Sequence, residues 1–139
     1  METITATGSA VDGHLQVDLG KTCNCLVGLV EITFPPLSIA DDYARQIDVC
    51  CSEIDRTFTN PNRILRRVFI NKTRFDVKFY RTVHFQHILY QKIDSFGRFL
   101  NIYLYDEIGQ PIKLPYNNYD EKITLVLSFI PKSDDQCLF

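Results

Sequence analysis

The chain has 139 residues, of which 45% are hydrophobic and 23% are charged, and its formal net charge is −2. This length fits a single domain that buries roughly two-thirds of its unfolded surface, so folding requires neither a metal nor a disulfide framework. The composition excludes a disordered chain, and the near-neutral charge excludes a general affinity for nucleic acid or membranes. No apolar run approaches the ~18 residues that span a bilayer, and no signal peptide is expected, because residues 1–9 lack a basic start and an apolar core.

Alternating apolar and polar side chains predict three strands within residues 14–52. Residues 14–19 and 47–52 alternate regularly, which predicts one inward and one outward face for each strand. Residues 25–34 are more apolar, and the side chains expected to share their inward face are Leu26, Val30, Ile32 and Phe34. Glu31 and Thr33 are expected on the opposite face, because successive side chains of a strand point to opposite sides.

Five further strands are expected, over residues 64–70, 75–80, 83–90, 100–105 and 122–129. In 64–70, Leu65 and Phe69 are predicted to share one face, interleaved with Arg66 and Val68. Residues 83–90 are apolar on both faces and less regular than the others. The most regular apolar stripe belongs to the last strand and consists of Ile123, Leu125, Leu127 and Phe129.

Turn residues separate these segments, and two glycines are expected to have special backbone roles. Gly28 lies inside an apolar strand, where glycine indicates a bend or the close approach of another backbone. Gly109, in Gly109-Gln110-Pro111, is expected to adopt a positive φ in a turn. No window of 12 or more residues has a helical period, so the eight strands predict an all-β fold, an eight-stranded antiparallel β-sandwich. Eight is the strand count of a single jelly roll, but periodicity does not distinguish that strand order from an immunoglobulin-like one.

The domain organisation expected from this pattern has three parts. Residues 1–13 form a flexible N-terminus, residues 14–131 the sandwich domain, and residues 132–139 a C-terminal tail.

Five cysteines occur in the chain, at Cys23, Cys25, Cys50, Cys51 and Cys137. Their number is odd, and their spacing fits neither a disulfide framework nor a zinc site. They are therefore predicted to be reduced thiols that pack as small apolar residues, which gives five free thiols.

Candidate catalytic or metal-binding residues do not form a recognisable constellation. His84 and His87 are three residues apart and point to opposite faces of a strand, and His14 is distant in sequence. Adjacent carboxylates such as Asp41-Asp42 lie at predicted turns, where solvated charges are expected. The Gly-x-Ser-x-Gly, phosphate-binding glycine and His-Glu-x-x-His patterns do not occur. The sequence thus predicts a protein that is not an enzyme and holds no cofactor or metal.

Basic residues are concentrated between positions 63 and 81, where seven bases face the single acid Asp76, a local excess of +6. Residues 1–62 instead carry nine acids and three bases. The candidate contact residues in the basic segment are Arg63, Arg66, Arg67, Arg74, Lys78 and Arg81. Three interpretations remain open: a solvated face, contact with an acidic neighbouring subunit, or contact with the phosphates of packaged nucleic acid.

Two stretches of the sequence resemble a known family. Residues 17–35, with Gly28-Leu29-Val30-Glu31-Ile32-Thr33-Phe34-Pro35, resemble the Gly-Leu-x-Glu-Ile-x-aromatic-Pro opening of small proteins from Polinton (Maverick) elements and adintovirus-like DNA viruses. Residues 100–112 resemble the Ile-x-Leu-x-Asp-x-x-Gly-x-Pro-Ile segment of the same group, which a closing strand like 123–129 follows. The resemblance covers most of 15–130 and implies a single jelly-roll capsid protein of the minor-capsid or penton type. The short N-terminus departs from the family, since it leaves little room for an extended arm.

The resemblance implies a structural viral protein that self-assembles into the virion shell. The partners it implies are further copies in a homo-pentamer or other closed ring, other capsid proteins, and packaged nucleic acid as a nonspecific contact, with no membrane contact. It implies synthesis in the host cytoplasm, assembly there or in the nucleus, and a final location in the virion.

Two other functions compete with the capsid interpretation. One is a non-viral binding module of the cytokine-like jelly-roll type, which would normally be secreted or membrane-anchored. The other is a cupin-like enzyme, which would need a metal-binding histidine set that His14, His84 and His87 do not supply.

Overall fold

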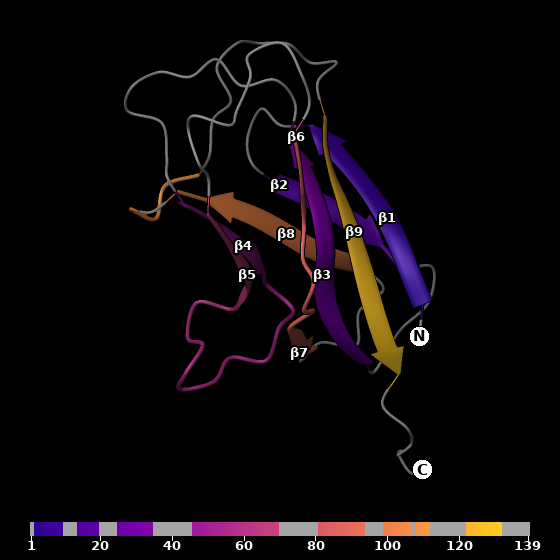
Figure 1. Cartoon of the computed structure of the whole chain (residues 1–139). Coiled ribbons are helices and arrows are strands. Elements are labelled where there is room, and N and C mark those ends of the chain that lie inside the picture. Colours follow the sequence, from indigo (N-terminus) through magenta and orange to yellow (C-terminus); the bar gives the residue numbers. More distant parts are fainter. Residues whose placement is uncertain are drawn as a thin grey trace.

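A computed structural model describes residues 2–9, 14–19, 25–34, 46–69, 81–93, 99–106, 108–111 and 122–131. Every regular element within these ranges is a strand (Figure 1). The strands are β1 (Glu2–Ser9), β2 (His14–Asp18), β3 (Cys25–Phe34), β4 (Gln46–Cys51), β5 (Ile64–Phe69), β6 (Arg81–His84), β7 (Tyr90–Lys92), β8 (Phe99–Tyr105) and β9 (Lys122–Pro131). The predicted all-β class is therefore confirmed. No helix in the described ranges is long and apolar enough to cross a membrane.

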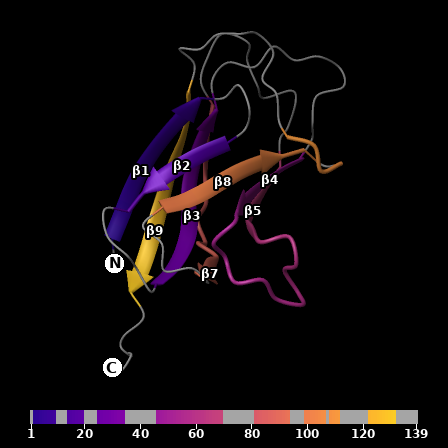
Figure 2. The same ribbon diagram turned by 180° about the vertical axis from the view of Figure 1, so that it is seen from behind.

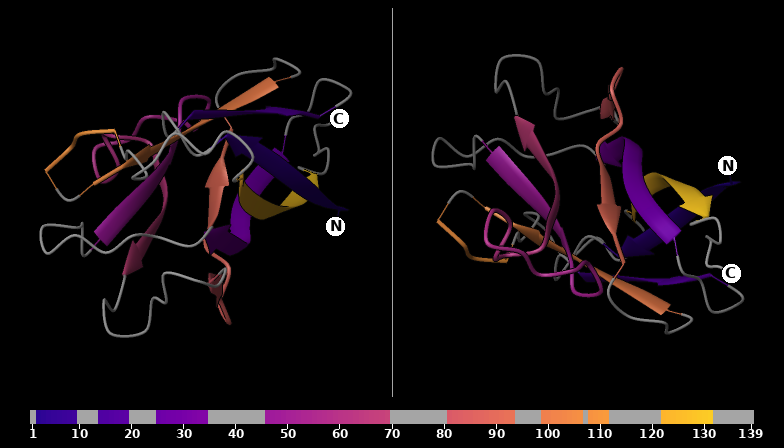
Figure 3. Two further views of the ribbon diagram at one scale, coloured as in Figure 1. Left: turned by 90° about the horizontal axis from the view of Figure 1, so that it is seen from above. Right: turned by 90° about the horizontal axis from the view of Figure 1, so that it is seen from below.

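The strands form two antiparallel sheets that pack face to face (Figures 1 and 2). One sheet has the order β1-β9-β3-β6, with β7 also paired to β3, and the other has the order β2-β8-β4-β5. The views from above and below show the two layers on either side of one interior (Figure 3). The chain is a β-sandwich, as the sequence predicts.

Strands β6 and β7 are two parts of one interrupted edge strand. His84 of β6 pairs with Glu31 of β3, and Tyr90 of β7 pairs with Gly28 further along the same edge of β3. Residues 85–89 lie between the two paired stretches, and only the Phe85 amide still donates a backbone hydrogen bond to β3 among those described, to the Val30 carbonyl oxygen at 3.0 Å. Counting this edge as one strand gives eight strands among the described residues, four in each sheet.

The pairing of these eight strands is that of a jelly roll. The pairs β1·β9, β2·β8, β3·β6/β7 and β4·β5 are nested, so they correspond to four rungs of one long hairpin. Rolling this hairpin up brings β9 beside β3 and β8 beside β4, which are the remaining two pairs. This order confirms the single jelly roll and excludes the immunoglobulin-like order that periodicity leaves open.

Six of the eight predicted strands correspond to single strands of the structure, namely β2, β3, β4, β5, β8 and β9. The less regular range 83–90 is the interrupted edge of β6 and β7. The predicted strand over 75–80 lies outside the described residues, as does the predicted tail over 132–139. The flexible N-terminus expected over 1–13 differs from the structure, because β1 pairs along its whole length with β9, from Glu2 opposite Phe129 to Ser9 opposite Lys122.

A single hydrophobic core fills the space between the two sheets. The inward stripes of β2, β4, β8 and β9 are the ones that the alternation predicts. Their buried members are Leu15, Val17, Ile47, Val49, Cys51, Leu100, Ile102, Leu104, Ile123, Leu125, Leu127 and Phe129. Burial of large aliphatic side chains at roughly 25 cal/mol per Å² is the main force that holds the two sheets together.

A β-bulge in β3 overturns part of the predicted inward face. The register passes from Leu29 opposite Leu127 to Glu31 opposite Val126, which leaves Val30 as the extra residue. Because a one-residue insertion reverses the alternation, Val27 and Leu29 are buried before the bulge and Ile32 after it. The prediction that Leu26 and Val30 share the face of Ile32 is therefore wrong, since both are only half-buried.

A second bulge, in β5, overturns the prediction that Leu65 and Phe69 share one face of the strand. Val49 lies opposite Arg66, and Cys50 lies opposite Ile64, so Leu65 is the extra residue. Leu65 and Val68 are both buried, whereas Phe69 is 73% exposed.

The cysteine prediction is wrong for Cys25. Cys25 is fully buried and disulfide-bonded, to a partner outside the described residues, whereas Cys50 and Cys51 are free. Spacing along the chain does not show which thiols the fold holds at the distance that a disulfide requires.

Candidate interaction surfaces

Arg63 helps to hold the loop between β4 and β5, residues 52–63, in place. Its backbone has a φ of 55°, in the left-handed region. Its Nε donates a hydrogen bond to the carbonyl oxygen of Ile54 at 3.0 Å, and its own carbonyl accepts one from the Cys51 amide at 3.0 Å. This side chain is used to hold the loop.

Arg66 bridges the two sheets along one open side of the sandwich. Its register partner Val49 is buried, so Arg66 lies on the inward side of β5, at the edge of its sheet. The guanidinium carbon lies 4.2 Å from the ring centroid of Phe85, and Nη1 donates to the His87 carbonyl oxygen at 2.9 Å. Phe85 and His87 belong to the interruption between β6 and β7, in the opposite sheet. A cation–π contact and a charge-assisted hydrogen bond therefore fasten the two edges together.

Arg67 is paired with Asp48, directly opposite it on β4. The contact has two hydrogen bonds, from Nε to Oδ1 at 2.8 Å and from Nη2 to Oδ2 at 3.4 Å. The side chains are 48% and 16% exposed, respectively. The hydrogen bond and the charge of Asp48 raise the pKa of Arg67, so the guanidinium stays protonated. Solvent screening limits the contribution of such a pair to about 0.2–1 kcal/mol.

For the other three candidate contact residues, the described part of the chain shows no cluster with Arg63, Arg66 and Arg67. Arg81 begins β6, where its backbone pairs with Phe34, and Arg74 and Lys78 lie outside the described residues. Charge counting detects the basic excess but cannot reveal that Arg63, Arg66 and Arg67 have partners inside the chain.

The outer face of the β2-β8-β4-β5 sheet carries a row of stacked rings. His14 on β2 stacks on Tyr103 of β8, with ring centroids 4.6 Å apart and planes 12° apart. Tyr103 in turn lies against Tyr105, with centroids at 6.3 Å and planes 19° apart. Side chains of this size are common in protein interfaces, because their rings bury a large area and their hydroxyl groups hydrogen-bond.

Asn101 and Glu53 attach the start of the β4–β5 loop to this outer face. The Asn101 amide donates to Glu53 Oε1 at 2.6 Å, and Asn101 Nδ2 donates to Oε2 at 3.1 Å. Asn101 Oδ1 also accepts a hydrogen bond from Gln16 Nε2 at 3.4 Å, so the side-chain amide of Asn101 on β8 links β2 to the β4–β5 loop.

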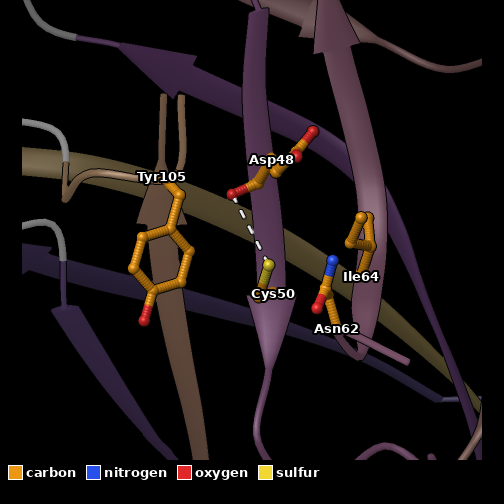
Figure 4. Close-up of a pocket in the computed structure, with 6 residues that line it drawn as sticks. Asp48, Cys50, Asn62, Ile64 and Tyr105 are labelled. Carbon is orange, nitrogen blue, oxygen red and sulfur yellow. Dashed lines mark hydrogen bonds between the residues drawn. The ribbon is translucent and has the colours of Figure 1, made fainter. Parts of the chain in front are cut away.

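A pocket of about 350 Å³ opens on the same face (Figure 4). Its lining residues come from three strands and two connections and are Asp48, Cys50, Asn62, Ile64, Tyr105 and Gly109. Figure 4 shows Cys50 between Tyr105 on one side and Ile64 on the other, with Asp48 beyond it.

Cys50 adds a neutral group to a pocket that the Asp48 carboxylate, paired with Arg67, also lines. Cys50 is 7% exposed, and burial, with a smaller effect of the Asp48 charge, raises its pKa to about 11. The thiol is therefore protonated at neutral pH, and its Sγ lies 3.9 Å from the Asp48 carbonyl oxygen. A neutral thiol between Tyr105 and Ile64 gives a surface that accepts an apolar or aromatic group.

Five large hydrophobic side chains are exposed among the described residues: Phe58, Phe69, Leu89, Phe99 and Ile108. Phe58 is the most exposed, at 101%, and Ile108 precedes Gly109, which lines the pocket. The sequence offers one signal for Phe58, which stands alone between Thr57 and Thr59 in a polar turn segment.

The described residues include no group of three or more His, Cys, Asp or Glu side chains that could hold a metal ion. No family model matches the sequence, and no curated protein matches it.

Proposed function

We propose that this protein is a structural viral capsid protein of the minor-capsid or penton type, whose copies associate through subunit contacts into a closed ring within a virion shell. The jelly-roll strand order is the observation that carries the proposal. A fold does not by itself define a function, so the proposal also rests on the sequence resemblance over 17–35 and 100–112.

Both resembling stretches specify the fold. The first contains β3, which pairs with β9 on one side and with β6 and β7 on the other. The second ends in a turn where Gly109 has a φ of 86°, as the sequence predicts. In this turn Asp106 Oδ1 accepts hydrogen bonds from the amides of Ile108 and Gln110, at 3.0 and 2.9 Å. Motifs of this kind suit a protein whose function is its shape and its copy number.

The surface of the jelly roll supports self-association. Exposed aromatic side chains and an open pocket lie on the surface of the domain. Large exposed apolar groups are typical of protein–protein contacts. A ring requires a heterologous interface, in which different surfaces of neighbouring copies meet and the rotation closes.

The basic segment is given a narrower part in this proposal. Arg63, Arg66 and Arg67 make contacts within the chain, so their contact with an acidic neighbour or with packaged nucleic acid would have to share or replace those contacts. Such contacts act through charge, and they weaken as the Debye length shrinks to ~3 Å at 1 M salt.

The test is the oligomeric state of the purified protein. We expect sedimentation velocity over a range of protein concentrations to give one closed species of several copies, and micrographs to show rings with five subunits favoured. A protein that stays monomeric at every concentration would contradict the proposal.

A non-viral binding module of the cytokine-like jelly-roll type is the second candidate, and the disulfide at Cys25 is the observation that favours it. Disulfides persist in secreted proteins, although they also occur at virion surfaces. A three-copy assembly would support this alternative, and a five-copy ring would support the capsid proposal.

A further inference from the structure

Phe58 is a large apolar side chain that is not buried by the rest of the chain. Its side chain is 101% exposed, at the tip of the β4–β5 loop, residues 52–63. A phenylalanine in water contributes nothing to the stability of the isolated chain, whereas its burial in a contact is strongly favourable.

The loop that presents Phe58 is firmly attached to the sandwich. On its first arm, Ile54 is buried, bridges to Ile93, and is followed by the Asp55 amide, which donates to the Lys92 carbonyl oxygen at 2.8 Å. On its second arm, Asn60 Nδ2 donates to the Ile64 carbonyl oxygen, and Asn60 Oδ1 accepts from the Ile64 amide, both at 2.9 Å.

The tip itself is closed by a further hydrogen bond. The Asn60 amide donates to the Thr57 carbonyl oxygen at 3.2 Å and lies 3.1 Å from Thr57 Oγ1. Phe58 is thus held outward by a turn that is ordered before any contact forms. An anchor that is ordered in advance loses little conformational entropy on binding, which is the property of an interface hot spot.

The same chain offers a matching cavity. The pocket beside Cys50 has a volume of about 350 Å³, lies open on the outer face of the β2-β8-β4-β5 sheet, and is walled by Tyr105 and Ile64 (Figure 4). The Asp48 carboxylate that also lines the pocket is only 16% exposed and is paired with Arg67, so its charge is balanced within the chain. The ring of Tyr105 and the aliphatic side chain of Ile64 are suited to contact a phenyl ring, since aromatic pairs add to the energy of simple area burial.

We propose that Phe58 of one copy occupies the Cys50–Ile64–Tyr105 pocket of the next copy. This inference rests on the proposed self-association and names the residues that would make the contact. The two halves of the contact are different residues, so each copy donates one anchor and accepts another. That is a heterologous interface of the kind that closes into a ring.

The first test removes the anchor and compares it with a matched control. We expect Phe58→Ala to weaken association by roughly 10- to 100-fold in sedimentation equilibrium, since burial of one phenylalanine corresponds to about that factor. Phe69→Ala is the same change at another exposed phenylalanine, on β5, and should weaken association much less than Phe58→Ala does. Neither residue contributes to the core, so both variants should fold as the wild type does.

The second test removes the pocket and then mixes the variants. Ile64→Asp places a charge in the wall of the pocket. Asn62→Trp fills the pocket instead, and because Asn62 is exposed while Ile64 is half-buried, this change should perturb folding less. The Phe58→Ala variant keeps an intact pocket, and the pocket variant keeps its Phe58. The two variants are mixed at a concentration at which each of them alone is monomeric. An equimolar mixture therefore holds one competent contact per pair, and we expect two-copy species that grow no further.

The outcomes separate this inference from the proposed function. If the wild type forms a ring and the Phe58→Ala variant forms it equally well, the Phe58 contact is overturned and the capsid proposal stays in place. Mixed variants that remain monomeric overturn the contact as well. A wild type that never associates overturns both.

Discussion

Replacement of Gly28 by alanine tests the placement of the β6–β7 interruption against β3. Gly28 pairs with Tyr90 of β7 and with Ser128 of β9. A Cβ atom at this position would overlap Ile88 Cγ2 and would lie 3.0 Å from the Leu89 carbonyl oxygen and 3.2 Å from Tyr90 Cδ1. The sequence-based expectation of a close backbone approach at Gly28 is thus confirmed.

Gly28→Ala should destabilise the fold by about 1–2 kcal/mol. The half-buried Ile88 side chain can rotate away, but the Leu89 carbonyl is backbone between two ordered neighbours and must shift. Over-packing of this kind costs about 1–3 kcal/mol. Alanine in a strand regains roughly 0.5–1 kcal/mol of the entropy that glycine loses on folding, which offsets part of the penalty. Tyr90 is displaced as well, and its hydroxyl lies 3.0 Å from the buried Ser128 Oγ.

Urea unfolding at one fixed protein concentration measures this effect, because association would otherwise change the apparent stability. The informative comparison is a double-mutant cycle of Gly28→Ala with Ile88→Ala. We expect the double variant to be more stable than the sum of the single changes predicts, by about 1 kcal/mol, since the smaller residue makes room for the new Cβ. Strict additivity, or a neutral Gly28→Ala variant, would refute the close approach.

Three further predictions follow from the core, the disulfide and the sheet edges. Leu125→Ala should lower the unfolding free energy by about 2–5 kcal/mol, whereas Thr124→Ala on the outer face should cost far less, and equal effects in urea unfolding would contradict the register of β9. Thiol titration of the denatured, non-reduced protein should find three free thiols, because two of the five cysteines form the Cys25 bridge, and five thiols would show that no bridge forms. Reduction of the bridge should lower the unfolding free energy by about 2–4 kcal/mol. Arg66→Ala should cost about 1–2 kcal/mol and speed hydrogen exchange at the Phe85 amide, and an unchanged exchange rate would argue against the bridge between the sheets.

The buried stripes could be predicted from the sequence wherever a strand is regular. Leu100, Ile102 and Leu104 alternate with half-exposed residues, and a period of two is enough to place them in the core. The bulges at Val30 and Leu65 could not be predicted, because an extra residue is defined by the partner strand and not by its own sequence. After each bulge the phase of the pattern reverses, which is why simple alternation places the half-buried Leu26 and Val30 of β3 in the core.

Strand β1 shows another limit of periodicity. Thr3, Thr5 and Thr7 give it β-branched residues at every second position, but its sequence contains only one large aliphatic residue, Ile4. A scan for apolar stripes therefore passes over it. Its assignment depends on β9, whose other edge is the pairing surface for β1.

The interaction surfaces were largely inaccessible to sequence reasoning. The pocket residues Asp48, Cys50, Ile64 and Tyr105 are brought together by three strands that are paired in space and separated in the chain. The basic segment shows the reverse case. Its charge excess is visible in the sequence, but the partners of Arg66 and Arg67 are fixed by the fold, so reversing those charges would perturb the monomer as well as any contact.

The sheet edges explain why side chains rather than strand edges would make the contacts on one side of this jelly roll. Edge strands attract further strands unless bulges, charges or interruptions prevent it. On the side formed by β5 and β6/β7, the first edge has a bulge at Leu65 and two arginines, and the second is interrupted over 85–89. Backbone pairing between copies is therefore disfavoured there. The pocket on the outer face of the sheet and the fastened β4–β5 loop remain available to a neighbour, and binding through Phe58 requires no strand to be rearranged.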